Sequence, residues 1–173
     1  RRQRQMCIRD RINALKAAQI ALTRRLQGNK VYELENNLAF KQDTGNQQTI
    51  LNNSRINVLV AIHDFYDSPH GMGFHFYPDF FIWLSKLGEI SEITNYNWYI
   101  KTHADLLWNG NDVIKDFVSK YKKFTVIPPD TSHHTLIKQG IDLALTVYGS
   151  IGMEYPALGI PVLNASSNNP HIN

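Results

Sequence analysis

Short apolar runs alternate with helical patterns over most of this chain. The apolar runs predict strands at residues 56–62, 97–102, 123–129, 142–148 and 160–166. Apolar residues at three- and four-residue steps predict helices at 78–91, 111–121, 131–139 and 150–158. Strands that are apolar throughout are usually covered on both faces by crossover helices. The pattern therefore predicts an α/β fold, a Rossmann-like doubly wound parallel sheet of about five or six strands.

The start of the chain has a different character. Residues 6–27 predict an amphipathic helix with an apolar stripe, which we expect to pack against the domain, another domain or another chain. The stripe consists of Ile8, Ile12, Leu15, Leu22 and Leu26. Residues 41–56 are polar and lack periodicity, which is typical of a loop or linker. We therefore divide the chain into a basic helix with a polar linker at 1–55 and a Rossmann-like domain at 56–173.

Composition supports a globular protein. Hydrophobic residues make up 43% of the chain and charged residues 19%, which argues against disorder. The single cysteine, Cys7, rules out an internal disulfide and fits a reducing compartment, so we expect a cytoplasmic protein. The sequence contains no apolar run of membrane-spanning length and no signal peptide pattern. The chain begins at Arg1 rather than at a methionine, and we expect it to be a fragment of a larger protein.

Positive charge is concentrated at the start of the chain. Residues 1–30 hold nine of the eighteen Lys and Arg residues and only one of the fifteen Asp and Glu residues. Such a basic face suits nucleic acid, anionic lipid or an acidic partner, and it is also typical of a helix face that simply meets solvent. Because no aromatic residues alternate with these charges, the pattern disfavours a stacking surface for single-stranded nucleic acid.

Polar and titratable residues follow each predicted strand. They are His63, Asp64, Asp67, Ser68, His70 and His75 after the first, Lys101, Thr102 and His103 after the second, Pro128 to Ser132 after the third, Gly149, Ser150, Gly152 and Glu154 after the fourth, and Asn164, Ser166 and Ser167 after the fifth. Ligands of doubly wound sheets bind beyond the carboxyl ends of the strands. We therefore predict a ligand site at this edge of the sheet.

The segment after the fourth strand has the clearest chemistry. Gly149 and Gly152 permit a tight turn, and Ser150 offers a hydroxyl at the start of a helix, where phosphate binds favourably. Glu154 lies one turn further on, where an acidic residue reaches a ribose hydroxyl in dinucleotide-binding folds. The alternative is a plain strand-to-helix turn in which Glu154 caps the first helical amides.

Three other kinds of site find less support. The phosphate-loop pattern GxxxxGK[ST] is absent, and "GMGFHF" fails the last position of the dinucleotide pattern GxGxxG. The cluster of His63, Asp64, Asp67, His70 and His75 could ligate a metal, but its spacing matches no zinc pattern and HExxH is absent. A general base, Asp64 or His63, is the favoured role for this loop, and we predict no metal or other cofactor.

Residues 56–173 resemble a known family. The stretches "VLVAIHDFYDSPHGMGFHFYPDFFIWL", "YIKTHADL" and "VYGSIGMEYPALGIPVLNAS" are similar to bacterial surface-polysaccharide glycosyltransferases of the GT-B type, especially capsule and lipopolysaccharide biosynthesis proteins. Most of the likeness lies in Gly152, Glu154 and Gly159, just before Pro161. The resemblance implies the nucleotide-sugar-binding half of a two-domain enzyme.

The resemblance also implies roles for individual residues. The donor phosphate would be bound by Ser150 and Gly152, and the ribose by Glu154. Lys101 and His103 match the family segment that faces the donor phosphate, although Ala104 replaces the proline of its His-Pro pair. Base and phosphate contacts would fall on Thr131 and Ser132. Together these assignments describe a metal-independent site in which basic side chains offset the charge of the leaving phosphate.

The expected function is transfer of a sugar from a nucleotide-sugar donor to a glycan or lipid-linked glycan acceptor of the bacterial surface. The acceptor-binding domain would precede the chain, the helix at 6–27 would link the two halves, and its cationic face would suit peripheral contact with the inner membrane. We do not expect a nucleic-acid partner. The alternatives are another GT-B-like enzyme, such as a nucleotide-sugar epimerase or a polyol-phosphate transferase, and a non-catalytic nucleotide- or carbohydrate-binding module.

Overall fold

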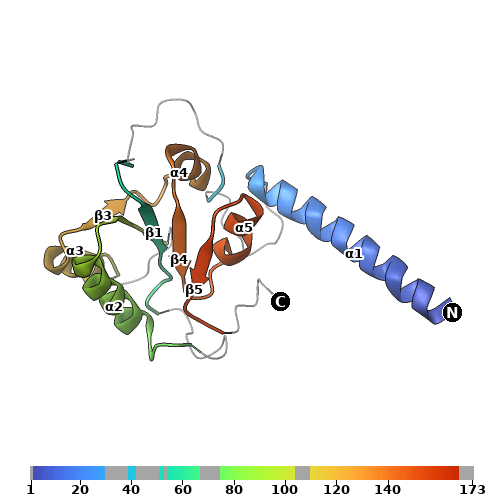
Figure 1. The fold of residues 1–173 in the computed structure, drawn as a ribbon, viewed down its shortest axis with the longest axis horizontal. Helices are drawn as coiled ribbons and strands as arrows, with labels where there is room; N and C mark the ends of the chain where they lie inside the picture. Colours follow the sequence, from blue (N-terminus) through green and yellow to red (C-terminus); the bar gives the residue numbers. More distant parts are fainter. Residues whose placement is uncertain are drawn as a thin grey trace.

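The computed structural model describes residues 2–29, 39–41, 51–52, 54–66, 75–103 and 110–167, with side chains from Ile8 onward. In chain order the elements are α1 (Arg2–Leu26), β1 (Asn57–Ala61), α2 (Phe80–Ile93), β2 (Asn97–Lys101), α3 (Gly110–Lys120), β3 (Phe124–Ile127), α4 (His133–Gln139), β4 (Leu143–Thr146), α5 (Ile151–Ala157) and β5 (Val162–Asn164) (Figure 1). Every strand and helix predicted from residue 56 onward is present, with ends that differ by at most two residues.

The five strands form one parallel sheet in the order β3-β2-β1-β4-β5. Leu59, in the central strand β1, lies opposite Tyr99 of β2 and Ala144 of β4. The chain moves outward from β1 to β3, then returns to the other side of β1 for β4 and β5. This reversal between β1 and β4 is the topological switch point at which doubly wound sheets bind ligands. The predicted fold class is confirmed.

The alternation of side chains along β1 explains why both faces of the sheet are covered. Val58 and Val60 face a core formed with α2 and α3, whereas Leu59 faces a second core formed with α4 and α5. All three side chains are at most 1% exposed. Successive strand residues point to opposite faces, so a strand without polar alternation needs helices on both sides.

The helices begin and end as their sequences predict. The Asp79 carboxylate accepts a hydrogen bond from the Ile82 N–H at 2.7 Å and caps α2, while Ser132 accepts from the His134 N–H and caps α4. Gly140 ends α4 with φ at 103°, a left-handed conformation that favours glycine. The first turn of α2 lies close to the end of β1, because His63 stacks on Phe80.

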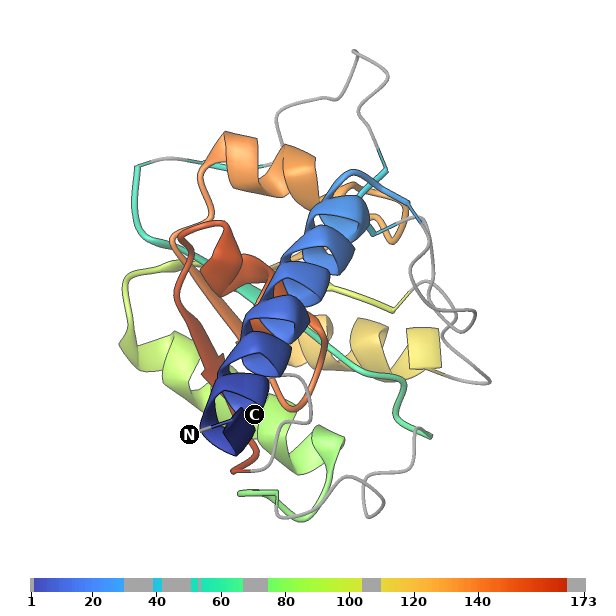
Figure 2. The same ribbon diagram turned by 90° about the vertical axis from the view of Figure 1, so that its right-hand side faces the viewer.

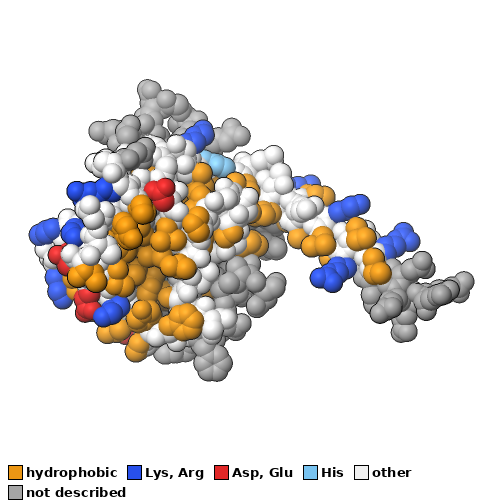
Figure 3. Space-filling view, in the orientation of Figure 1, with side chains coloured by type: hydrophobic (Ala, Val, Ile, Leu, Met, Phe, Trp, Pro, Cys, Tyr) orange, Lys and Arg blue, Asp and Glu red, His pale blue; other side chains and the backbone are white. Residues whose placement is uncertain are grey.

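The predicted N-terminal helix is present as α1, which projects away from the domain (Figures 1 and 2). Ile8, Ile12 and Leu15 are 56%, 47% and 58% exposed, so this part of the apolar stripe does not pack against described residues of the domain. Figure 3 shows hydrophobic and basic side chains beside one another along the helix. Among the side chains of α1 that the structure describes, only Arg25 is buried, and the half-buried Leu26 packs against the core beneath α4 and α5.

Candidate functional site

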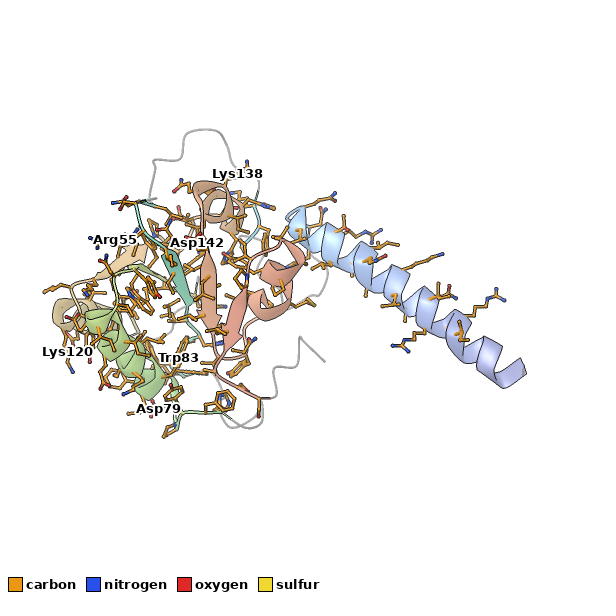
Figure 4. All side chains as sticks on the ribbon, viewed as in Figure 1. Arg55, Asp79, Trp83, Lys120, Lys138 and Asp142 are labelled. Atoms are coloured by element: carbon orange, nitrogen blue, oxygen red, sulfur yellow. The ribbon has the colours of Figure 1, made fainter. Side chains whose placement is uncertain are left out.

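The predicted site residues gather around the carboxyl edge of the sheet. In Figure 4, Arg55 and Asp142 mark the edge of the sheet at which β1 and β4 begin. Asp79, which caps α2, marks the opposite edge, where the strands end. His63 follows β1 at this second edge, and Gly149 follows β4. The sequence correctly places these strand ends side by side, because all five strands run in the same direction.

His63 joins β1 to β4 at the switch point. Its Nε2 accepts a hydrogen bond from the Tyr148 N–H at 3.2 Å and lies 3.3 Å from the hydroxyl of Thr146. Because Nε2 accepts from a backbone amide, the imidazole is neutral there and carries its proton on Nδ1. The ring also stacks on Phe80 and meets Tyr148 at a tilt, and these two rings contact one another. For His63 to act as a general base through Nε2, it would have to give up the Tyr148 amide.

Asp64, the other predicted general base, is 8% exposed. Its Oδ1 accepts a hydrogen bond from the Tyr66 N–H at 3.0 Å and so holds the turn that follows β1. A carboxylate held in this way is well oriented. The catalytic roles of Asp64 and His63 stay predictions, because nothing in this geometry identifies an acceptor hydroxyl.

His75 reaches the same edge from a distant part of the sequence. It forms an antiparallel bridge with Ser166, after β5, and its ring meets the rings of Phe80 and Tyr148 edge-on. Its Nε2 is buried and has no hydrogen-bond partner among the described residues. His63 and His75 therefore share one aromatic cluster. Of the other residues considered as metal ligands, Asp67 and His70 lie outside the described residues, and no three His, Cys, Asp or Glu side chains come together within the described part.

Lys101 is a buried cation at the end of β2. It is 6% exposed and donates a hydrogen bond to the Pro129 carbonyl at 2.7 Å. Burial lowers the pKa of Lys101 to about 8, and the opposing charge of Asp130 partly offsets this effect. An ammonium group has three N–H donors, and this carbonyl is its one acceptor among the described residues. The side chain is therefore suited to an anionic ligand.

The segment after β3 carries two predicted contact residues, Thr131 and Ser132, which are 6% and 2% exposed. The Thr131 N–H closes a turn onto the Pro128 carbonyl at 3.0 Å, and the Ser132 hydroxyl is used as the cap of α4. His103, after β2, is exposed. Thr131 and Ser132 are thus shielded from solvent in this structure, while His103 is accessible to a ligand.

The segment after β4 connects two residues for which the sequence predicts separate roles. Ser150 stands at the start of α5, yet its hydroxyl does not cap the helix and instead donates to Glu154 Oε2 at 3.2 Å. Glu154 Oε1 accepts from Arg25 Nε at 2.8 Å, in an ion pair whose side chains are 9% and 2% exposed. Glu154 is therefore not the simple helix cap of the alternative interpretation. Gly152 is buried, and its N–H donates to the Gly149 carbonyl.

Sequence reasoning missed three residues that adjoin the site. Arg25 comes from the last turn of α1, and its guanidinium lies 5.7 Å from the centre of the Phe40 ring. His133 Nδ1 lies 2.6 Å from the hydroxyl of Tyr155, so α4 and α5 are joined through a buried polar contact. Burial lowers the pKa of His133 to about 3 and raises the pKa of Tyr155. The sequence offered no signal for Arg25, because 129 residues separate it from Glu154.

Comparison with known proteins yields no match to a family model, a curated protein or a solved structure. The family resemblance of residues 56–173 therefore stays a resemblance, and the assigned residue roles stay predictions. Among the described residues, no helix has both the length and the apolar character needed to cross a bilayer.

Proposed function

We propose that residues 56–173 bind the nucleotide of a nucleotide-sugar at the carboxyl edge of the sheet. Lys101 carries this proposal. Its ammonium group is 6% exposed, has one backbone acceptor in the part of the chain that the structure describes, and lies beside the switch strand β1. Burying an unpaired charge is costly, so such a group suggests an anion that completes its environment. A diphosphate is the anion that a doubly wound sheet most often receives at this edge.

The chain is then the donor-binding half of a glycosyltransferase that extends a bacterial surface polysaccharide. Lys101 and His103 would offset the negative charge that develops on the departing nucleotide diphosphate. Ser150 and Gly152 would contact the phosphates, Glu154 the ribose, and Thr131 and Ser132 the base and phosphate. Asp64, His63 or a group from an acceptor-binding domain would take the proton of the acceptor hydroxyl.

The test is a thermal-shift and calorimetric screen with UDP, GDP, CMP and their sugar conjugates. We expect one nucleotide to raise Tm, because a ligand that binds only the folded state stabilises it. Lys101→Met should weaken that binding by about tenfold or more, the typical contribution of a hydrogen bond to a charged group. Lys138→Met is the matched control, since Lys138 is an exposed lysine in the last turn of α4. Absence of binding for every nucleotide would refute the proposal.

We also propose that the protein is cytoplasmic and touches the inner membrane through α1. Arg9, Arg11 and Lys16 are exposed on the described part of this helix, next to the exposed apolar residues Ile12 and Leu15. Sedimentation with vesicles of phosphatidylglycerol, compared with phosphatidylcholine alone, measures this contact. Binding should require the anionic lipid and should fall as salt is raised. Equal sedimentation with both lipids would contradict a charge-driven contact.

A further inference from the structure

The last turn of α1 is attached to α5 by a buried ion pair. Arg25 and Glu154 are both buried, and their side chains meet at 2.8 Å. Phe40 packs beneath the guanidinium and is fully buried. A second contact lies close by, where His134 Nε2 meets the carbonyl oxygen of Leu26. The C-terminal end of α1 is thus held against the element that the proposed function assigns to the nucleotide.

The side chains of Glu154 and Ser150, which the proposed function assigns to the nucleotide, are both already hydrogen-bonded within the protein. One carboxylate oxygen of Glu154 accepts from Arg25, and the other accepts the proton of the Ser150 hydroxyl. A serine hydroxyl has only one proton to donate, so Ser150 cannot donate to a phosphate while it donates to Glu154. With 1% of Glu154 exposed, ribose hydroxyls do not reach the carboxylate in this arrangement.

We propose that Arg25 and the ribose of the nucleotide compete for Glu154, so that the last turn of α1 closes the donor site until a nucleotide binds. This inference rests on the proposed function, because it requires the ribose hydroxyls to bind Glu154. On binding, the two ribose hydroxyls replace the guanidinium as donors to the carboxylate. The Ser150 proton is then available to a phosphate oxygen. Two states that exclude each other at one carboxylate must be thermodynamically linked.

The main experiment compares nucleotide affinity in Arg25→Gln and in the natural chain, using UDP, GDP and CMP. We expect the variant to bind the preferred nucleotide about fivefold more tightly or better, a typical size for a coupling between two binding events. Arg24→Gln is the matched control, because Arg24 is the adjacent, exposed arginine of the same turn. That variant should bind with unchanged affinity.

The 2′,3′-dideoxy forms of the same nucleotides test the ribose directly. They lack the hydroxyls that would replace Arg25, so Arg25→Gln should not improve their binding. If Arg25→Gln binds ribonucleotides no more tightly than the natural chain, or improves the dideoxy forms equally, competition for Glu154 is refuted.

A second measurement needs no substitution and covers the case in which Arg25→Gln does not fold. The Nε–H of a buried, hydrogen-bonded arginine exchanges slowly with solvent and gives a resolved nuclear magnetic resonance signal. Adding the preferred nucleotide should accelerate exchange of the Arg25 Nε–H, whereas Arg24 should be unaffected. Binding without acceleration refutes the competition alone. Failure of the natural chain to bind UDP, GDP or CMP refutes the proposed function, and the competition with it.

Discussion

The hydroxyl of Tyr155 lies 2.6 Å from Nδ1 of His133, and this contact joins the two helices that cover one face of the sheet. Tyr155 is fully buried and His133 is 6% exposed, so neither group can exchange this partner for water. The segments that follow β3 and β4 therefore have a shared support. Four predictions test the surroundings of this contact and of the site.

Replacing Tyr155 with Phe removes the hydroxyl and leaves the His133 ring nitrogen buried without this partner. We expect the free energy of unfolding to fall by about 1–3 kcal/mol, the cost of an unsatisfied buried polar group. Urea unfolding with an unchanged m value measures the loss. Tyr121→Phe, in the opposite core, is the control and should have a smaller effect. Equal losses for both variants would mean that the contact contributes little.

The pKa of His133 predicts a loss of stability in acid. Burial, followed by the charges of Lys101 and Arg25, lowers this pKa to about 3, whereas an unfolded histidine titrates near 6.5. Between these values the unfolded chain binds more protons, so stability falls as pH falls from about 6.5 toward 3. The slope from one such group is at most about 1.4 kcal/mol per pH unit.

His133→Gln should flatten the dependence of unfolding free energy on pH between 7 and 4. The natural chain, measured under the same conditions, is the reference. The difference between it and the variant isolates His133 from the carboxylates, which also titrate in this range. An unchanged slope in His133→Gln would contradict the lowered pKa.

The pKa of Lys101 predicts effects at alkaline pH. Burial lowers it from 10.5 to about 8, so between these values the unfolded chain binds more protons and stability rises with pH. Lys101→Met should remove this rise, while Lys138→Met should keep it. In the natural chain, nucleotide affinity should fall as pH increases above about 8, because the ammonium loses its charge. Affinity that is constant from pH 7 to 9.5 would exclude Lys101 as a phosphate ligand.

Gly149 is expected to tolerate no side chain. A β-carbon there would lie 2.8 Å from the Thr146 hydroxyl, which accepts from the Gly149 N–H and meets His63 Nε2. Gly149→Ala should therefore cost about 1–3 kcal/mol of stability and weaken nucleotide binding. Gly159→Ala is the comparison, since its β-carbon would meet nothing within 4 Å and only its φ of 81° is unfavourable. That variant should lose about 1 kcal/mol and keep nucleotide affinity.

The parallel direction of the strands and the meeting of their ends follow from local patterns. Apolar runs such as 142–148 require burial on both faces, and helices between successive strands favour parallel crossover connections. Residues directly after a strand, such as His63 and Lys101, therefore had to lie along one edge. The sequence alone was sufficient for the fold class and for placing these residues at one edge of the sheet, whereas their role as a ligand site stays a prediction.

Only the tertiary structure decided which of these residues contact one another. Nothing near Glu154 in the sequence predicts Arg25, since the partner comes from a helix at the other end of the chain. His75 likewise reaches His63 only because its segment bridges to Ser166, beyond the last strand. Local patterns report the periodicity and propensity of neighbouring residues, whereas hydrogen bonds and ion pairs depend on distances between segments that the folded backbone brings together. The sequence by itself determined the fold class and which residues follow the strands, and the tertiary structure decided that Glu154 and Ser150 already contact one another and Arg25.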